Sequence, residues 1–583
     1  MAAVERRENI QARSRPVMAN HRAHYPVLAC LLLFVPLTAG ADRILSVLPA
    51  AQPDSWIVEA EADGEPAVWL DGVATQAEIE TIGGGRYRIV VEAVPASVGQ
   101  LGIGRSEPLV AVQLQPVPHQ AKPFNDLIVY HIMLGYFANG ASSNDRSGMR
   151  RWVHRNYAGG DLQGVLARAD YLAELGVNAV WLSPIFQSET SHGYDVMNYY
   201  RISDALAVPG DQEASLALYR QLVGALGDRG IRVILDMPLN HAAGSYDKRR
   251  GDPDRQKPKS TAAKQDAEKV WESWGTGLRF WNFSHDNTRR FLKDAALYWL
   301  GEEGAGGLRL DYVRGVEHEF WAELYAEVKR QQADDILFGE AWQDADGPAA
   351  NMADISSYYA EVPGIGYQFD ALIEFPMQMV MTDVFARGGD VELLEQWLQA
   401  ETAAYGPHGA PMYFLDNHDM TRFADWAINA PAQRVLAAVT FMASLPGPMS
   451  IYYGTETALG GSTAQKGFTD SNRVRMPWDE LNQTLVADIA AVFRTKRAHP
   501  VLTHGARLPL FADKDGLIML RLHGSDTALV AVNMGSEPKV FTLDFPSDAG
   551  EFRALTGATA PEVRDGRLRW ELPGLSTWIA LRD

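Results

Sequence analysis

The sequence predicts an α/β protein: a TIM (β/α)8 barrel with a small insertion after strand 3, flanked by N-terminal and C-terminal β-sandwich domains. Through the middle of the chain, eight short apolar runs alternate with segments of helical period, which is the pattern of repeated β-α units. On either side, the sequence changes to short alternating runs interrupted by Gly and Pro, which is typical of small β domains. Eight β-α units predict a closed barrel.

The composition fits a large globular protein and argues against several functional classes. The 583 residues are 46% hydrophobic and 22% charged, which suits about three to five domains and excludes a disordered or fibrous chain. The formal charge is −20. Because nucleic acids and anionic membranes bind basic surfaces, we expect neither as a partner. The single cysteine, Cys30, excludes a disulfide scaffold and a cysteine-ligated zinc site.

Residues 1–41 have the composition of a signal peptide. Arginines precede an apolar run over residues 27–37, and Ala39-Gly40-Ala41 offers a cleavage site. Met18 is an alternative start that gives a signal of ordinary length. Eleven apolar residues are short for a retained membrane anchor, and the apolar run follows the cysteine where a lipoprotein signal would precede it. We expect a periplasmic or secreted protein with no membrane anchor after cleavage.

The predicted domains follow one another along the chain. We expect the N-terminal β-sandwich at 42–121, the barrel at 122–504 and the C-terminal β-sandwich at 505–583, with a polar insertion at about 242–285 over the barrel mouth. The expected barrel strands are Leu127–Met133, Ala179–Ile185, Arg232–Pro238, Gly306–Tyr312, Ile336–Trp342, Phe369–Phe375, Pro411–Asn417 and Pro448–Gly454. The expected helices between them include Leu162–Leu175, Gln212–Arg229, Asn287–Leu300 and Val391–Tyr405. A doubly wound sheet is the alternative, but it would need a Gly-rich phosphate loop after an early strand, and the sequence has none.

Four carboxylates lie at or just past the C-terminal ends of predicted strands three, four, five and seven: Asp236, Asp311, Glu340 and Asp419. In a barrel of this kind the strand ends meet on one rim, where the chemistry takes place. Crowded carboxylates raise the pKa of at least one member, so that a protonated acid and an ionised nucleophile coexist near neutral pH. Retaining glycoside hydrolysis requires such a pair. One such acid alone would be an ordinary turn or helix N-cap residue; four on one rim predict an active site.

The acids lie within four motifs that agree in order and spacing with those of a known family. The motifs are Asp236-Met-Pro-Leu-Asn240-His241, Gly307-Leu-Arg309-Leu-Asp311, Gly339-Glu340-Ala-Trp342 and Phe414-Leu-Asp-Asn-His418-Asp419. Weaker marks are Gly160-Asp161-Leu-Gln-Gly164, His192-Gly-Tyr194-Asp195 and Tyr452-Tyr-Gly-Thr-Glu456. From Phe124 to about Gly505 the chain resembles the α-amylase family of glycoside hydrolases (family 13). Within that family it is most similar to cyclomaltodextrinase- and neopullulanase-like members or related α-amylases.

The resemblance implies a role for each matched residue. The implied catalytic residues are Asp311 as nucleophile, Glu340 as acid and base, and Asp419 as a ligand of the sugar hydroxyls in the transition state. The implied substrate-binding residues are His192, Tyr194, His241, Arg309, Arg314 and His418, with Asp236 as structural support for Arg309. Because Arg309 lies two residues before Asp311 on a strand, both side chains face the same side, where the guanidinium can keep the carboxylate ionised.

The subgroup resemblance also implies a bound Ca²⁺ ion. Its ligands would be Asn139, Asn144, Asp145, the carbonyl of Gly159 and Asp161, and Ala141 stands where the subgroup has a further aspartate. Clustered oxygen ligands of this kind suit a hard cation, whereas the alternative is a solvated polar turn. Arg314 and Gly315 replace a Lys-His pair that many members have, which counts against a second calcium site found in those members.

The resemblance implies a retaining hydrolase of α-1,4-glucosidic bonds in maltooligosaccharides, cyclodextrins, pullulan or starch, acting through a covalent glycosyl-enzyme. A transglycosylase or isomerase of the trehalose or sucrose type would share that intermediate and remains an alternative. A non-catalytic glycan-binding module would have lost the nucleophile or the acid, and both stand here. A homodimer formed through the N-terminal sandwich is a further expectation from the subgroup.

Overall fold

The computed structural model describes residues 43–49, 56–62, 64–71, 73–83, 86–92, 100–104, 108–113, 124–150, 156–243, 278–342, 347–406, 409–461, 472–545 and 550–583. The predicted signal peptide at 1–41 lies outside these residues. So does the part of the predicted insertion at 244–277.

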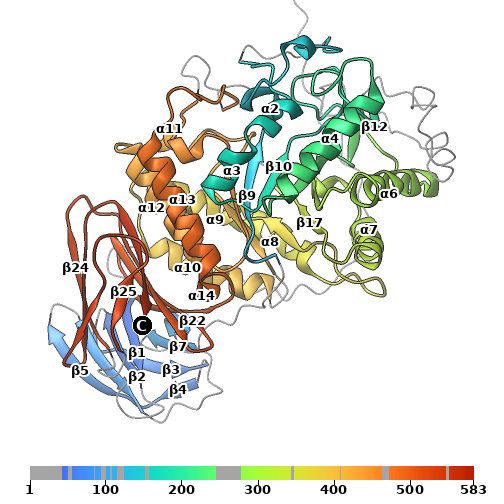
Figure 1. Ribbon diagram of the computed structural model, residues 1–583. Helices are drawn as coiled ribbons and strands as arrows, with labels where there is room; N and C mark the ends of the chain where they lie inside the picture. The colour runs from blue at the N-terminus through green and yellow to red at the C-terminus, as the bar shows by residue number, and fades with distance from the viewer. Residues whose placement is uncertain are drawn as a thin grey trace, which may run out of the picture. The chain divides into compact units, whose positions relative to one another are not determined.

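Eight parallel strands close into a barrel (Figure 1), which confirms the predicted fold. The strands are β9 (Ile128–Ile132), β10 (Ala179–Leu182), β13 (Arg232–Met237), β16 (Gly307–Leu310), β17 (Ile336–Gly339), β18 (Ala371–Ile373), β19 (Pro411–Phe414) and β20 (Met449–Tyr452). Each neighbours the next, and β20 pairs with β9 to close the ring. Every strand lies within the apolar run that predicts it.

Helices and short strands connect the barrel strands (Figure 1). The helical elements are α1 (Leu134–Phe137), η1 (Ser142–Asn144), α2 (Leu162–Ala167), α3 (Ala169–Leu175), α4 (Gln212–Gly227), α6 (Asp286–Gly301), η4 (Val313–Gly315), α7 (His318–Gln331), α8 (Pro348–Tyr359), α9 (Phe375–Met381), η5 (Thr382–Ala386), α10 (Glu392–Tyr405), α11 (Phe423–Trp426), α12 (Pro431–Ser444), η6 (Thr455–Thr457), α13 (Gln483–Ala498) and α14 (Pro500–Thr503). Two short hairpins pair β11 (Phe186–Gln187) with β12 (Asn198–Ile202) and β14 (His241–Ala243) with β15 (Leu278–Phe280). Within the described ranges, no helix has both the length and the apolar character that a membrane crossing requires.

One predicted helix is divided in the structure. The run Leu162–Leu175 forms α2 and α3, with Arg168 between them at φ −107° and ψ 11°. The N–H of Arg168 donates to the carbonyl of Val165, three residues back, which tightens the turn. Its guanidinium lies 4.0 Å from the centroid of the Trp478 ring, a contact that sequence periodicity does not reveal.

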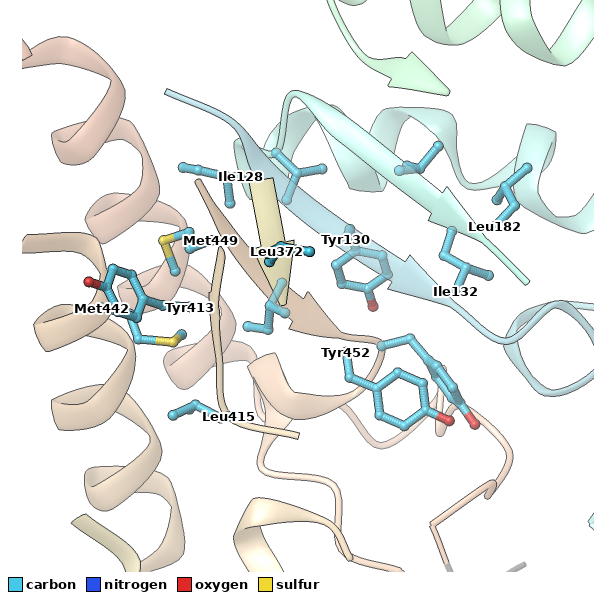
Figure 2. Close-up of a cluster of buried hydrophobic side chains, with 14 of the residues drawn as sticks. Ile128, Tyr130, Ile132, Leu182, Leu372, Tyr413, Leu415, Met442, Met449 and Tyr452 are labelled. Atoms are coloured by element: carbon cyan, nitrogen blue, oxygen red, sulfur yellow. The ribbon is translucent and has the colours of Figure 1, made fainter. Parts of the chain in front are cut away.

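Successive side chains of each barrel strand alternate between the interior and the surrounding helices. On β9, Ile128, Tyr130 and Ile132 pack outward, and Figure 2 shows them in a buried cluster that includes Met442 of α12. The interior is filled by the alternate positions, which include Val129, Trp181, Ile234, Phe338, Ile373 and Phe414. Because the period of a strand is two, interior positions near the strand ends include His131, Asp236, Arg309 and Glu340. The barrel thus orients these polar side chains toward its own axis.

Antiparallel sheets flank the barrel in the sequence. The N-terminal strands are β1 (Arg43–Pro49), β2 (Trp56–Glu61), β3 (Ala67–Leu70), β4 (Val73–Thr75), β5 (Glu78–Gly83), β6 (Arg86–Val91), β7 (Gln100–Gly104) and β8 (Pro108–Gln113). The C-terminal strands are β21 (Ala506–Ala512), β22 (Gly516–His523), β23 (Asp526–Asn533), β24 (Lys539–Asp544), β25 (Phe552–Ala554), β26 (Glu562–Arg564), β27 (Arg567–Leu572) and β28 (Ser576–Arg582). Each set forms two sheets around its own apolar core, as expected for sandwiches.

The two flanking regions share one sheet, which the sequence does not predict. β1 pairs antiparallel with β21 at Ser46 and Phe511, so a nine-stranded sheet runs in the order β25-β28-β23-β22-β21-β1-β2-β6-β5. An ion pair of 3.1 Å between Arg88 of β6 and Asp544 of β24 adds a second link. Side-chain alternation gives a strand its buried face but does not identify the neighbour it pairs with.

Candidate active site

Arg309 is the centre of the polar cluster inside the barrel. Its side chain is completely buried, on β16. Nη1 donates to both oxygens of Asp236, at 2.9 and 3.1 Å, and to Oδ1 of Asp311 at 2.7 Å. Nη2 lies 2.6 Å from Oε1 of Glu340, as an ion pair whose direction is poor for a hydrogen bond. One guanidinium therefore holds three of the four predicted carboxylates together.

The predicted nucleophile and the predicted acid lie beside this guanidinium in different electrostatic settings. Asp311 follows β16 directly, is 7% exposed and accepts the hydrogen bond from Arg309. Glu340 follows β17 and is 5% exposed. Burial raises the pKa of Glu340 to about 8; Arg309 opposes that shift, whereas Asp311, Asp419 and Asp236 add to it. Glu340 is therefore a proton donor at neutral pH.

The backbone has an unusual conformation at the residue after Asp311. Tyr312 has φ 44° and ψ 58°, the left-handed region that a bulky residue seldom adopts. In this conformation its N–H donates to Oε2 of Glu340 at 3.3 Å. The strained residue thus joins the position after the predicted nucleophile to the predicted acid, as expected of strain that is concentrated at functional sites.

Asp419 lies at the same end of the barrel between a histidine and an arginine. His418 Nε2 is 3.0 Å from Oδ2 of Asp419, and Arg473 Nη2 is 3.0 Å from Oδ1. Burial by itself would raise the pKa of Asp419, but His418, Arg473 and Arg309 together hold it below the ordinary value. Asp419 is therefore ionised while Glu340 keeps its proton. The two environments shift the pKa values of Glu340 and Asp419 in opposite directions, so one carboxyl is protonated and the other is ionised.

Tyr194 connects the carboxylates to the neighbouring histidines. Its hydroxyl donates to Oδ2 of Asp236 at 2.7 Å, and its ring stacks on that of His418 with centroids 5.1 Å apart and planes at 3°. The His192 ring stacks on that of Tyr194 with centroids 6.0 Å apart, and its Nδ1 accepts the N–H of Tyr194. His241 contacts the carbonyl of Tyr194 through Nε2 at 3.2 Å, and its Nδ1 is 3.8 Å from Oδ2 of Asp311. Burial lowers the pKa of His241, although Asp311 opposes the shift.

Arg314 is placed apart from the cluster by its ion pair. It lies on η4, and its Nη2 is 2.9 Å from Oδ2 of Asp354 on α8. This ion pair directs the guanidinium toward α8. The other predicted substrate-binding residues, by contrast, contact the carboxylates or one another.

Three further residues belong to the cluster and are missing from the sequence prediction: His131, Trp181 and Arg473. Trp181 donates from Nε1 to Oδ2 of Asp236 at 2.9 Å, and His131 stacks on the Trp181 ring at 3.6 Å. Both are interior residues at the ends of β9 and β10, so the strand alternation that singles out Asp236 could have found them. Arg473 lies in the segment after β20, where no periodic pattern marks it.

The five predicted calcium ligands lie between β9 and α2 and contact one another in two groups. Asn139 donates to Asp145 at 2.8 Å, Asn144 donates to Asp161 at 3.0 Å, and Gly159 packs against the side chains of Asn139 and Asp145. Oδ1 of Asn144 is buried and accepts no hydrogen bond from the described residues, as expected of an oxygen that binds a cation.

Asp161 fits the proposed ion less well than the other four residues. Its two oxygens accept four N–H groups, from Gly140, Ala141, Asn144 and Gly164. The carboxylate thereby caps the N-terminus of α2 and organises the loop. Within the described residues, no three His, Cys, Asp or Glu side chains cluster in a geometry for a metal, so amide and carbonyl oxygens would have to complete the ligand set around Asp145.

Comparisons with known proteins agree with this geometry. The family model for the α-amylase catalytic domain matches residues 132–277 and 276–484. A cyclomaltodextrinase of Bacillus sp. is 31% identical over 442 residues, covering 70% of this chain and 72% of that protein. Neopullulanase 2 of Thermoactinomyces vulgaris is 29% identical over 488 residues, covering 78% and 77%.

Solved structures give the same result. An Anoxybacillus α-amylase superposes with a TM-score of 0.67 at 27% identity and covers 79% of this chain and 98% of that chain. These matches confirm the resemblance carried by the four motifs and the identification as a glycoside hydrolase. The chain belongs to the α-amylase family.

Proposed function

We propose that this enzyme is a retaining hydrolase of α-1,4-linked glucose chains, with cyclodextrins and short maltooligosaccharides as its preferred substrates. One observation carries the proposal: the buried guanidinium of Arg309 joins Asp311 and Glu340 in settings that leave Glu340 protonated. Retaining hydrolysis needs an ionised nucleophile and a protonated acid on the same glycosidic bond.

In the first step, a carboxylate oxygen of Asp311 attacks the anomeric carbon of the sugar. Glu340 gives its proton to the glycosidic oxygen, which leaves as the hydroxyl of the released chain. The bond that forms is the ester between Asp311 and the sugar, and the bond that breaks is the glycosidic bond. Arg309, which keeps its hydrogen bond to Oδ1 of Asp311, positions the attacking carboxylate.

In the second step, water resolves the ester. Glu340, now a carboxylate, removes a proton from the water as its oxygen attacks the anomeric carbon, and Asp311 leaves as a carboxylate. Asp419, held ionised, accepts hydrogen bonds from sugar hydroxyls that strengthen as positive charge develops on the ring. Each residue ends the cycle in the protonation state in which it began.

The relatives support the choice of substrate class. Proteins named cyclomaltodextrinase and neopullulanase match more than two thirds of their own length to this chain. The experiment is product analysis with the purified enzyme on β-cyclodextrin, maltotriose, pullulan and soluble starch. We expect β-cyclodextrin to be cleaved faster than starch; rapid internal cleavage of starch would contradict the preference, and accumulation of longer oligosaccharides would indicate glycosyl transfer.

The stereochemistry of the first product tests the retaining mechanism separately. Proton NMR during early hydrolysis should show the α-anomer before mutarotation equilibrates it. The β-anomer as first product would contradict a covalent intermediate on Asp311, whichever substrate is preferred.

We also propose a Ca²⁺ ion bound by Asn139, Asn144, Asp145 and the carbonyl of Gly159, with Asp161 holding the loop. The buried Oδ1 of Asn144, which accepts no hydrogen bond from the part of the chain that the structure describes, supports this proposal. The ion would stabilise the loop that follows β9, and it takes no part in the two steps above.

Export and self-association complete the proposal. The composition of residues 1–41 supports release into the periplasm or the medium. The subgroup resemblance supports a homodimer. Cell fractionation with N-terminal sequencing tests the first, with a cytoplasmic, uncleaved protein as the contrary result. Size-exclusion chromatography with light scattering tests the second, and a monomer at micromolar concentration would contradict it.

A further inference from the structure

Asp419 is held by an arginine that lies outside the strand-end motifs. Arg473 follows β20 in the chain and is 8% exposed. Its Nη2 donates to Oδ1 of Asp419 at 3.0 Å, and its Nε donates to the carbonyl of His418 at 3.0 Å. One side chain thus fixes both the carboxylate of Asp419 and the main chain of the residue before it.

The segment that carries Arg473 is itself anchored from several sides. Arg422, completely buried, donates from Nε to the carbonyl of Asn472 at 3.0 Å and from Nη1 to that of Tyr453 at 2.8 Å. Asn472 donates to the carbonyl of Met420 at 2.7 Å, and Tyr453 donates through its hydroxyl to the carbonyl of Val474 at 2.6 Å. These bonds fix the main chain on both sides of Arg473, so its guanidinium has a defined position.

The titratable groups around Asp419 come from several elements, and they include His131 of β9 and Tyr194 between β11 and β12. His418 and Asp419 lie on the loop after β19, Arg473 on the segment after β20, Arg309 on β16 and Glu340 after β17. His418 occupies Oδ2 of Asp419 and Arg473 occupies Oδ1, so the two oxygens have different partners. The guanidinium has a planar set of donors that can bind two acceptors at once, whereas a lysine ammonium offers one nitrogen.

We propose that Arg473 is a positioning residue for the hydrolytic reaction, which holds the Asp419 carboxylate in the orientation that binds sugar hydroxyls in the transition state. The inference rests on the proposed function and assigns a role to a residue that no strand-end motif contains. Arg473 acts through Asp419: it places one carboxylate oxygen and supplies part of the positive charge that favours the ionised form. Since Asp419 acts chiefly in the transition state, removal of Arg473 should lower kcat more than it raises KM.

Two substitutions distinguish the positioning of the Asp419 carboxylate by Arg473 from the effect of the positive charge of Arg473. Arg473→Gln removes the cation, and Arg473→Lys keeps the charge but cannot hold Asp419 and the His418 carbonyl together. Arg475→Gln is the matched control, because Arg475 is an exposed arginine two residues further along the same segment. Each variant is compared with the wild-type full chain for kcat, KM and the pH profile of kcat on β-cyclodextrin, and for its melting temperature.

We expect Arg473→Gln to lower kcat by about 100-fold, as a misplaced reacting group does, while KM changes by no more than a few-fold. The acid limb of its kcat profile should move to higher pH, because Asp419 has lost a cation that favours its ionised form. Arg473→Lys should lower kcat with a smaller shift of the acid limb, and Arg475→Gln should behave as wild type.

Three results would overturn the inference. One is wild-type kcat and pH profile in Arg473→Gln. The second is a rise in KM at constant kcat, which would indicate direct binding of substrate. The third is a lower melting temperature with normal kinetics, which would indicate a structural role; if Arg473→Gln does not fold, Arg473→Lys decides by the same three criteria. A wild-type enzyme that cleaves none of the α-glucans would instead refute the proposed function.

Discussion

Nη2 of Arg309 lies 2.6 Å from Oε1 of Glu340, yet the pKa of Glu340 is raised to about 8. A single guanidinium shared by three carboxylates does not offset both the burial of Glu340 and the negative charge of its neighbours. The acid therefore keeps its proton beside a permanent cation, and this balance has a consequence for the pH dependence of the reaction.

The rate should fall on the alkaline side as Glu340 loses its proton. We expect the alkaline limb of kcat/KM to lie near pH 8, because kcat/KM reports ionisations of the free enzyme. Glu340→Gln should remove that limb and lower kcat by about 10²–10⁴-fold. The loss in kcat/KM, which reports the first step, should be much smaller with α-maltosyl fluoride, whose leaving group needs no proton. An equal loss on the fluoride and on maltotriose would contradict the acid role.

Replacing Asp311 by Asn should abolish turnover without unfolding the protein. The amide keeps the shape of the carboxylate and can still accept from Arg309, but it is not a nucleophile. We expect kcat to fall on the order of 10⁴-fold or more, with a circular dichroism spectrum like that of wild type. Asp311→Asn with ordinary hydrolysis rates would refute the mechanism.

A second pair of buried carboxyls should control stability rather than catalysis. Glu374 and Glu401 are both buried and interact electrostatically, and Tyr405 and Tyr413 donate to Glu374 and Glu401 at 2.8 and 2.9 Å. Burial raises the pKa of Glu401 to about 8, and Arg507 lowers it only in part. The folded protein therefore retains a proton that the unfolded chain releases above about pH 4.5.

The free energy of unfolding should consequently decrease as pH rises from about 4.5 to about 8, because the folded state binds more protons than the unfolded state in that window. The total loss is on the order of a few kcal/mol for such a shift. Glu401→Gln imitates the protonated carboxyl and should flatten the decline, as measured by melting temperature in buffers from pH 5 to pH 8. Parallel curves for the two proteins would contradict a shared proton.

Removal of calcium should lower the melting temperature. An ion at 100 times its dissociation constant contributes about 2.7 kcal/mol to the folded state. We expect EDTA to lower the melting temperature of the wild type and added CaCl2 to restore it. Asp145→Ala should lose this response, whereas Asp228→Ala, an exposed aspartate at the end of α4, should keep it. A wild type indifferent to EDTA and CaCl2 would exclude the ion.

The site residues at the strand ends can be predicted from the sequence. Asp236, Arg309, Asp311 and Glu340 follow from the apolar runs and from the two-residue period of a strand, because the barrel turns one side of every strand inward. His131 and Trp181 also lie at inward-facing strand positions. A histidine or tryptophan within an apolar run, however, is equally typical of a buried core residue.

Arg473 and the division at Arg168 depend instead on contacts between distant segments. Arg473 reaches Asp419 because other side chains anchor its segment, and Arg168 ends α2 beside the ring of Trp478. Neither contact leaves a periodic signal in the sequence. Residues that act through such tertiary contacts become visible only in the folded chain.

The nine-stranded sheet also affects how the chain folds during its synthesis. During synthesis the N-terminal strands leave the ribosome long before β21 exists, so the edge of β1 that will pair with β21 stays open while the whole barrel is translated. An open strand edge is a site of pairing with other chains. Premature termination before Phe511 would therefore leave the N-terminal sandwich with an unpaired edge and expose the nascent product to aggregation.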